Sequence, residues 1–203
     1  MNYIQTSVVQ TEPLTLEQAR DHLRVTPYGS PLEHPDDTYI SALITSAREF
    51  CEEYTRRALA TKTVEVVFDS WSDNKLVLPF APLQSVTSVQ YVDVTGVTQT
   101  LATTVYGVDR FRRQIYLKAG QTWPPLYSDP NPIIVTAEVG YTNGQSPDIY
   151  PMPETIMSAM KLIIGNLYEN RQQDLLGSTR ISFNSLPLGV YNLLQPYRLG
   201  MGC

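Results

Sequence analysis

The chain has few residues of the kinds that catalyse reactions or bind metal ions. His22 and His34 are its two histidines, and Cys51 and Cys203 are its two cysteines. The HExxH and CxxC spacings of metal sites do not occur, and neither does the Gly-x-Ser-x-Gly turn that carries a nucleophilic serine. The glycine-containing stretch 140–144 lacks the Lys-Ser/Thr ending of a phosphate-binding loop. The sequence therefore predicts no metal site, no cofactor and no enzymatic activity.

Two pairs of neighbouring acids are the candidates for a catalytic pair that shares a proton. They are Asp36–Asp37 and Glu52–Glu53. Adjacent residues of a helix point about 100° apart, so two such carboxylates do not face one another. We expect them to serve as helix caps and solvent-exposed polar groups. Trp71 and Trp123 lie near turns, and we expect them to pack in a core or an interface.

One local cluster of positive charge stands out, at Arg110, Arg112 and Arg113, with a phenylalanine between the first two. It lies between two strand-like segments, so we place it at a hairpin tip. Two interpretations stay open: contact with DNA phosphates or an acidic neighbouring subunit, or an ordinary solvated turn. Three arginines alone do not define a nucleic-acid site.

Composition restricts the class of protein. The 203 residues carry a net charge of −5, which argues against a sequence-reading DNA binder with its usual basic face. Two distant cysteines form no disulfide framework and suit a reducing cytoplasm. The first ten residues show no secretory signal, and no apolar run reaches the ~20 residues that span a bilayer. Residues 151–203 hold three acids and four bases and are otherwise apolar, which suits docking onto another protein.

The periodicity of apolar residues predicts four helices. After an extended segment over 1–13, a capping box of Thr15 and Gln18 opens the first helix, which ends before Pro27. The second begins at Asp36 or Asp37 and runs to about residue 58. Its expected polar face carries Arg48, Glu49, Glu52, Glu53, Arg56 and Arg57. The third follows Pro153, and a short last helix lies within 186–198.

Between the second and third helices the period changes to alternation, which indicates strands. We expect strands at 61–69, 75–78, 85–93, 99–101, 105–108, 114–117 and 132–139, forming one small antiparallel sheet. The predicted fold class is α+β: a small helical bundle with an inserted antiparallel β-sheet subdomain and a C-terminal docking segment. The predicted boundaries are 1–60 with 151–173 for the helical core, 61–150 for the insertion, and 174–203 for the C-terminal arm.

Several sequence segments, taken in their order along the chain, resemble the head–tail connector (adaptor) family of long-tailed bacteriophages. Residues 13–24 (PLTLEQARDHLR) and 36–57 resemble its first two helices. Residues 78–83 (LPFAPL), 89–93 (VQYVD) and 135–141 (VTAEVGY) resemble its strands. Residues 153–160 (PETIMSAM) and 186–198 (LPLGVYNLLQPYR) resemble its third helix and C-terminal end. The resemblance covers most of the chain.

The resemblance implies a structural subunit of the virion neck, assembled in the host cytoplasm. It implies a homo-oligomeric ring, dodecameric, that sits below the portal protein, extends the DNA channel and receives a stopper or tail-completion protein. DNA would pass through without sequence-specific binding. It also implies that a C-terminal segment over about 178–198 docks onto the portal, through Leu186, Val190, Leu193, Leu194, Tyr197 and Arg198.

Two alternatives remain. Another neck component, such as a stopper or tail-completion protein, would be shorter and more uniformly β. A small nucleic-acid-processing enzyme would need convergent polar residues, which the sequence does not display. A closed ring needs two different patches on each subunit. The charged face of the second predicted helix and the loops of the sheet are candidates for these patches.

Overall fold

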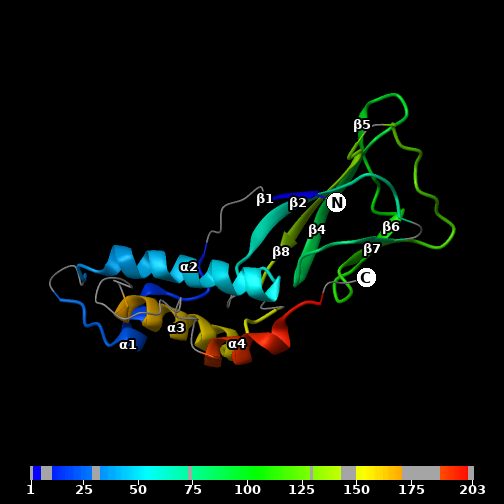
Figure 1. Ribbon diagram of the computed structural model, residues 1–203. Helices are drawn as coiled ribbons and strands as arrows, with labels where there is room; N and C mark the ends of the chain where they lie inside the picture. The colour runs from blue at the N-terminus through cyan, green and yellow to red at the C-terminus, as the bar shows by residue number, and fades with distance from the viewer. Residues whose placement is uncertain are drawn as a thin grey trace, which may run out of the picture. The chain divides into compact units, whose positions relative to one another are not determined.

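The structure is a computed structural model that describes residues 2–5, 11–28, 33–72, 75–128, 130–142, 150–170 and 188–200. The chain forms two compact units (Figure 1). The β unit comprises Met1–Thr11 and Ala60–Pro151, and the helical unit comprises Glu12–Leu59 and Met152–Cys203. The mixed α+β class agrees with the sequence prediction. No helix in the described part of the chain is long and apolar enough to cross a bilayer.

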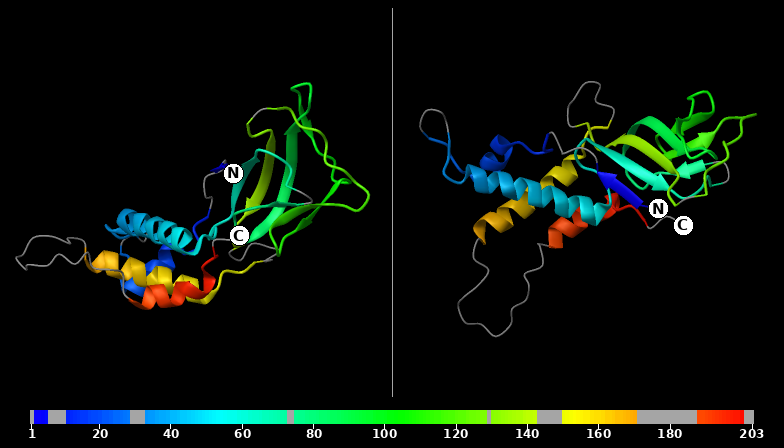
Figure 2. Two further views of the ribbon diagram at one scale, coloured as in Figure 1. Left: turned by 45° about the vertical axis from the view of Figure 1, so that its right-hand side comes forward. Right: turned by 90° about the horizontal axis from the view of Figure 1, so that it is seen from above.

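The helical unit is built around two packed helices. Its elements are α1 (Leu16–Leu23), α2 (Asp37–Thr55), α3 (Glu154–Glu169), α4 (Leu188–Leu194) and the short 3-10 helix η1 (Gln195–Tyr197). Helix α2 packs along α3, α1 contacts both, and α4 packs on α3 (Figure 2). The apolar stripes predicted for the two long helices form this core, with Ile40, Ile44, Ile156, Met160 and Ile164 all buried.

Helix α1 begins as predicted. The Thr15 hydroxyl accepts from the Gln18 amide at 3.1 Å, and the Gln18 side chain accepts from the Thr15 amide at 3.0 Å. This reciprocal pair satisfies two amides that the first turn would otherwise leave without partners. The helix ends at Arg24, whose backbone is left-handed with φ 57°.

The acids at the start of α2 do not act as the predicted caps. Asp36 occupies the cap position, but its side chain makes no capping hydrogen bond there. Its carboxylate instead accepts from the Tyr168 hydroxyl of α3 at 2.6 Å. The Asp37 carboxylate pairs with the Arg20 guanidinium of α1 and accepts from the His34 amide at 2.8 Å. Both acids therefore connect neighbouring elements of the helical unit.

Periodicity placed Arg48 on the polar face of the second helix, but this part of the face is covered. Arg48 is only 6% exposed. Its guanidinium donates to Glu12 at 2.8 Å and to Glu52 at 3.1 Å, with Glu49 more distant at 3.5 Å. Glu12 lies on the segment before α1, so a chain segment distant in sequence covers this face of α2. Glu52 likewise is not a solvated acid, because it also accepts from the Leu59 amide at 2.8 Å.

The β unit contains two antiparallel sheets where one was expected. The larger has the order β1-β2-β8-β4-β5 and the smaller has the order β3-β7-β6. Their strands are β1 (Asn2–Gln5), β2 (Lys62–Phe68), β3 (Lys75–Val77), β4 (Leu83–Val92), β5 (Thr98–Thr100), β6 (Tyr106–Asp109), β7 (Gln114–Leu117) and β8 (Ile133–Val139). The N-terminal strand β1 pairs with β2, so the extended segment at the start of the chain contributes to the sheet.

The buried face of the larger sheet follows the predicted alternation. Strand β8 alternates buried and half-buried residues along its length, and Val64 and Val66 of β2 are buried beside it. Gly140 ends β8 with φ 112°, and a Cβ there would lie 2.1 Å from the Ala60 carbonyl oxygen. Only glycine permits this approach of two backbone segments.

Candidate interaction surfaces

The hairpin between β6 and β7 holds the predicted basic cluster in a fixed turn. Asp109 pairs with Gln114 at the end of the ladder, and residues 110–113 form the connection. The Asp109 carboxylate accepts from the Arg112 amide at 2.9 Å. Arg113 is left-handed, and its carbonyl accepts from the Leu78 amide at 2.8 Å. These bonds hold the turn to its own strand and to the segment after β3.

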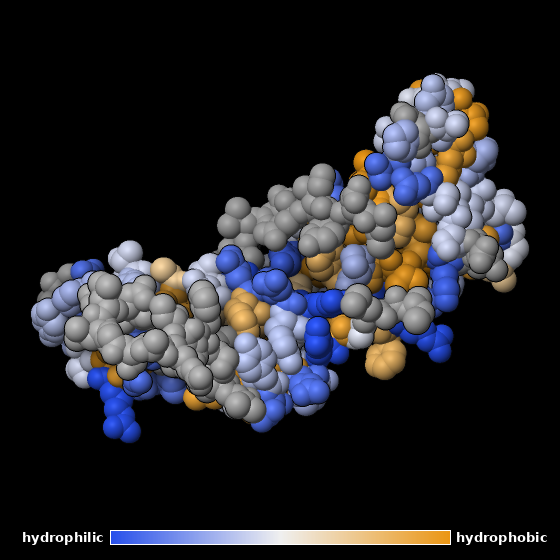
Figure 3. Space-filling view, viewed as in Figure 1, coloured by the Kyte–Doolittle hydropathy of each residue, from blue (hydrophilic) through white to orange (hydrophobic). Residues whose placement is uncertain are grey.

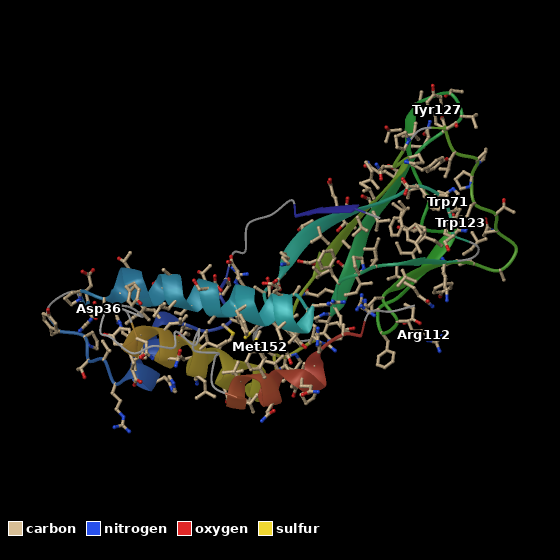
Figure 4. All side chains as sticks on the ribbon, viewed as in Figure 1. Asp36, Trp71, Arg112, Trp123, Tyr127 and Met152 are labelled. Atoms are coloured by element: carbon tan, nitrogen blue, oxygen red, sulfur yellow. The ribbon has the colours of Figure 1, made fainter. Side chains whose placement is uncertain are left out.

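The side chains of this turn differ in exposure. Arg110 and Arg112 are exposed, whereas Arg113 is half-buried and donates to the Pro79 carbonyl at 3.5 Å. Phe111 is 94% exposed. Within the described residues, neither Arg110 nor Arg112 pairs with a carboxylate. We call Arg110, Phe111 and Arg112 the basic tip. Arg112 is labelled at the end of this hairpin in Figure 4. The sequence already placed Phe111 at a hairpin tip, and the structure puts it in the connection beyond the last paired residues of β6 and β7.

The residues predicted to dock onto a portal fall into three groups. Leu186, with the rest of 178–187, lies outside the described residues. Val190 and Leu194 are 0% exposed, because α4 buries them within the helical unit. Leu193 and Tyr197 are half-buried and Arg198 is exposed. Of the predicted set that the structure describes, three side chains therefore have surface available to a partner.

The C-terminal segment is attached to the end of α2 by rings and backbone bonds. The Tyr191 ring meets Tyr54 edge-on at 5.4 Å and Phe50 at 6.2 Å between centroids. The Arg57 guanidinium donates to the Tyr197 carbonyl at 2.7 Å. The Leu199 amide donates to the Thr55 carbonyl at 2.9 Å. Edge-to-face aromatic pairs and charged donors each add to the stability that burial provides.

A hollow opens between α2 and α4, and its lining combines rings with charges: Phe50, Glu53, Tyr54, Arg56, Tyr191 and Arg198. We call it the aromatic hollow. The Arg198 guanidinium lies 5.3 Å from the centroid of the Tyr54 ring, in a cation–π contact. Glu53 is exposed, and no cation pairs with its carboxylate within the described residues. The sequence placed Glu53 on a polar helical face, and it gave no sign that α4 would complete a hollow beside it.

The β unit carries most of the exposed apolar side chains among the described residues: Val77, Val94, Val97, Phe111, Tyr116 and Tyr127. Figure 3 shows apolar residues gathered over its strands. In the same unit, the half-buried Trp71 and Trp123 stack with ring centroids 4.5 Å apart (Figure 4), and the Trp71 indole donates to the Pro124 carbonyl at 2.8 Å. The two tryptophans therefore pack against one another, as expected of tryptophans near turns.

The turn between β4 and β5 is organised by one carboxylate. Asp93 accepts from the Thr95 amide at 2.8 Å, from the Val97 amide at 3.1 Å and from the Gln99 side chain at 3.0 Å. The Thr95 hydroxyl also donates to it, and the bonds from Thr95 and Gln99 lower the pKa of Asp93 to about 2. These bonds stabilise the ionised carboxylate, and the turn presents the exposed Val94 and Val97.

The reactive side chains of the described residues are not gathered into a centre. No group of three or more His, Cys, Asp or Glu side chains that could hold a metal ion occurs among them. Cys51 is buried, and burial raises the pKa of its thiol to about 12, with the nearby Glu52 adding to the effect. A thiol with that pKa stays protonated at neutral pH and is a poor nucleophile.

Solved structures with a similar fold are known. No protein-family model and no curated protein sequence matches the chain. Three solved structures of a gene transfer agent (GTA) particle contain chains with a similar fold. They are the neck of the empty particle computed with C6 symmetry (TM-score 0.74), the virion of the native particle (0.75), and the neck of the native particle computed with C12 symmetry (0.69). The chain shares their fold. Each match has 21% sequence identity and covers 100% of this chain and 98% of the other, so the likeness includes both units.

Proposed function

We propose that the chain is a structural head–tail connector (adaptor) of a tailed phage or phage-like particle. It forms a ring in the neck, below the portal, that extends the DNA channel and joins head to tail. The observation that supports this is the match of fold over the entire chain to chains of GTA neck structures. The C6 and C12 symmetries of those necks suit a ring, and we propose a dodecamer.

The described surfaces suit such a role. A ring subunit needs two different patches that meet their counterparts on neighbouring copies. The β unit offers exposed apolar side chains and the basic tip, and the helical unit offers the aromatic hollow. Exposed aromatic residues and arginines are typical of the parts of an interface that contribute most to affinity.

Electron microscopy of particles carrying a small tag on this chain tests the proposal directly. We expect density for the tag in a ring between portal and tail, and we expect particles lacking the chain to have heads without joined tails. Complete, infectious particles assembled without the chain would refute the proposal. A tag found on the capsid shell or at the distal end of the tail would refute it as well.

We further propose that the C-terminal segment contacts the portal protein. Three described residues of this segment are at least partly exposed and could contact the portal: Leu193, Tyr197 and Arg198. Leu186 belongs to the same proposed contact surface. Truncation after Asn184 is a poor test, because it also removes Val190 and Leu194 from the core of the helical unit. The double variant Leu193→Ala with Arg198→Glu keeps that core intact.

Pull-down with purified portal protein and with tail-tube protein separates an adaptor from a stopper or tail-completion protein. We expect the chain to retain the portal and not the tail tube. We expect the double variant to retain less portal while still folding cooperatively in a thermal melt. Capture of the tail tube alone would favour the tail-completion alternative. Unchanged portal capture by the double variant would exclude the proposed contact surface while leaving the adaptor function standing.

A further inference from the structure

The basic tip presents an aromatic side chain that no residue of its own hairpin covers. Phe111 is 94% exposed between two exposed arginines, and the turn beneath it is fixed by the Asp109 and Leu78 bonds. Burying an exposed phenylalanine side chain is favourable, and a fixed turn loses little conformational entropy on binding. A rigid support for an exposed ring therefore favours insertion into a pocket of a protein.

DNA explains this tip less well. A phosphate contact needs the arginines and gains nothing from a ring that must stay in water. Arg113, the third arginine of the cluster, is half-buried and donates to the Pro79 carbonyl. Two guanidinium groups beside one aromatic ring instead match the composition of protein–protein contacts, in which Arg and aromatic residues are enriched.

The aromatic hollow has the complementary chemistry. The Phe50, Tyr54 and Tyr191 rings already meet one another edge-on or stacked, so a further ring can join them in the same geometry. Glu53 at its wall is exposed and has no cationic partner within the described residues. The hollow thus offers an apolar seat for a ring and one carboxylate for a guanidinium.

We propose that Phe111 of one copy inserts into the aromatic hollow of the next copy, and that Arg112 pairs with Glu53 there. This inference rests on the proposed ring. The basic tip on the β unit and the aromatic hollow on the helical unit are different patches of the same chain, so each copy uses one of each. Such a heterologous contact is the kind from which a closed ring is built.

The other charges of the hollow set the direction of the contact. Arg198 lies over the Tyr54 ring, and Arg56 is a second arginine in the lining of the hollow. Both arginines repel the arginines of an incoming basic tip. Glu53 attracts them, so Arg112 is expected to lie beside Glu53. Because repulsive and attractive charges line the same hollow, the basic tip can bind there in one orientation and not in the others.

A photo-reactive phenylalanine analogue at position 111 tests the contact in assembled necks. We expect cross-links to a second copy of the chain, mapped by mass spectrometry to the peptides that carry Phe50–Tyr54 or Tyr191. The same analogue at Tyr127, which is 44% exposed on the same unit, is the matched control and should not yield those peptides. Cross-links from position 111 to DNA, to another neck protein or elsewhere on the chain would overturn the inference.

Charge exchange provides a second, independent measurement. We expect Arg112→Glu and Glu53→Arg each to lower the yield of assembled necks about tenfold, and the double variant to recover most of it. Lys75→Glu and Glu169→Arg, which reverse exposed charges elsewhere, should leave the yield unchanged. Thermal melting confirms that each variant folds. Loss in the single variants without recovery in the double variant would overturn the pairing, as would an unchanged yield in all of them.

The two proposals fail in different ways. Absence of the chain from the neck by electron microscopy refutes the connector function. If the ring is present in the neck but position 111 cross-links to other residues, only the contact between the basic tip and the aromatic hollow is refuted.

Discussion

The buried guanidinium of Arg48 makes the helical unit depend on carboxylates from two parts of the chain. Burial alone would lower the pKa of Arg48, but the hydrogen bond to Glu12 and the other nearby acids outweigh it, and the pKa is raised. The charge is therefore kept inside the unit by its partners. Removing one member of such a cluster leaves the others partly desolvated and without compensation.

We predict that Arg48→Ala lowers the free energy of unfolding by about 3 kcal/mol, because Glu12 and Glu52 then lose their shared cation. Glu49→Ala is the matched control, since Glu49 has a side chain that is 66% exposed and lies farthest from the guanidinium. It should change stability by less than about 0.5 kcal/mol. Urea unfolding monitored by circular dichroism measures both. Equal effects of the two substitutions would contradict the cluster described here.

Asp93 gives the protein an acid-sensitive turn. Its folded pKa of about 2 lies below the unfolded value of roughly 3.9. The ionised carboxylate therefore adds stability that is complete above about pH 5 and is lost as the pH falls from about 4 to about 2. We predict that the stability difference between the wild-type chain and Asp93→Asn narrows across this window. Unfolding measured at a series of pH values tests it, with Asp21→Asn of α1 as control. A constant difference down to pH 2 would contradict the assignment.

At the scale of single residues, interactions within one helical turn were predictable from the sequence, and interactions between segments far apart in the sequence were not. The Thr15–Gln18 capping box was found from sequence because both partners lie within one helical turn. The burial of Arg48 was not predictable, because its partner Glu12 is 36 residues away in the sequence. Periodicity assigns a residue to a face of its own helix, but it carries no information about which later or earlier segment covers that face.

Among the elements, helix α4 has two neighbouring leucines with different roles. Leu194 is 0% exposed and Leu193 is half-buried. We predict that Leu194→Ala lowers the free energy of unfolding by about 2–4 kcal/mol, whereas Leu193→Ala costs less than about 1 kcal/mol. Thermal or urea unfolding of the purified variants measures this. If Leu194→Ala left stability unchanged, α4 would not be a part of the folded helical unit.

The strands were predicted almost residue by residue, yet their division into two sheets was not. Alternation of apolar residues is local, so it identified β2 and β8 and placed the hairpin of β6 and β7. Which strands pair depends on contacts across the whole β unit, including the N-terminal strand β1 on the edge of the larger sheet. The aromatic hollow was not predictable for the same reason, because Tyr191 contacts Tyr54, which lies 137 residues earlier in the chain.

For the whole molecule, the balance of charge bears on how DNA would be handled. Twenty acids against 15 bases give a net charge of −5, and the exposed arginines of the basic tip are a small part of the surface. Attraction to duplex DNA grows with the number of phosphates that a protein neutralises. A channel built from an acidic subunit would therefore let DNA pass without retaining it.

We predict that the purified chain binds a short labelled DNA duplex more weakly than about 10⁻⁴ M near physiological salt, the weak end of non-specific binding. Fluorescence anisotropy between about 50 and about 200 mM salt measures the affinity and its salt dependence. Arg112→Ala should leave the result unchanged, as should its control Lys75→Ala, because two exposed arginines neutralise too few phosphates. Micromolar binding that weakened steeply with salt and was lost in Arg112→Ala alone would assign the basic tip to DNA. That outcome would remove the main reason for seating Phe111 in a neighbouring copy, since one exposed tip cannot serve both partners at once in a closed ring.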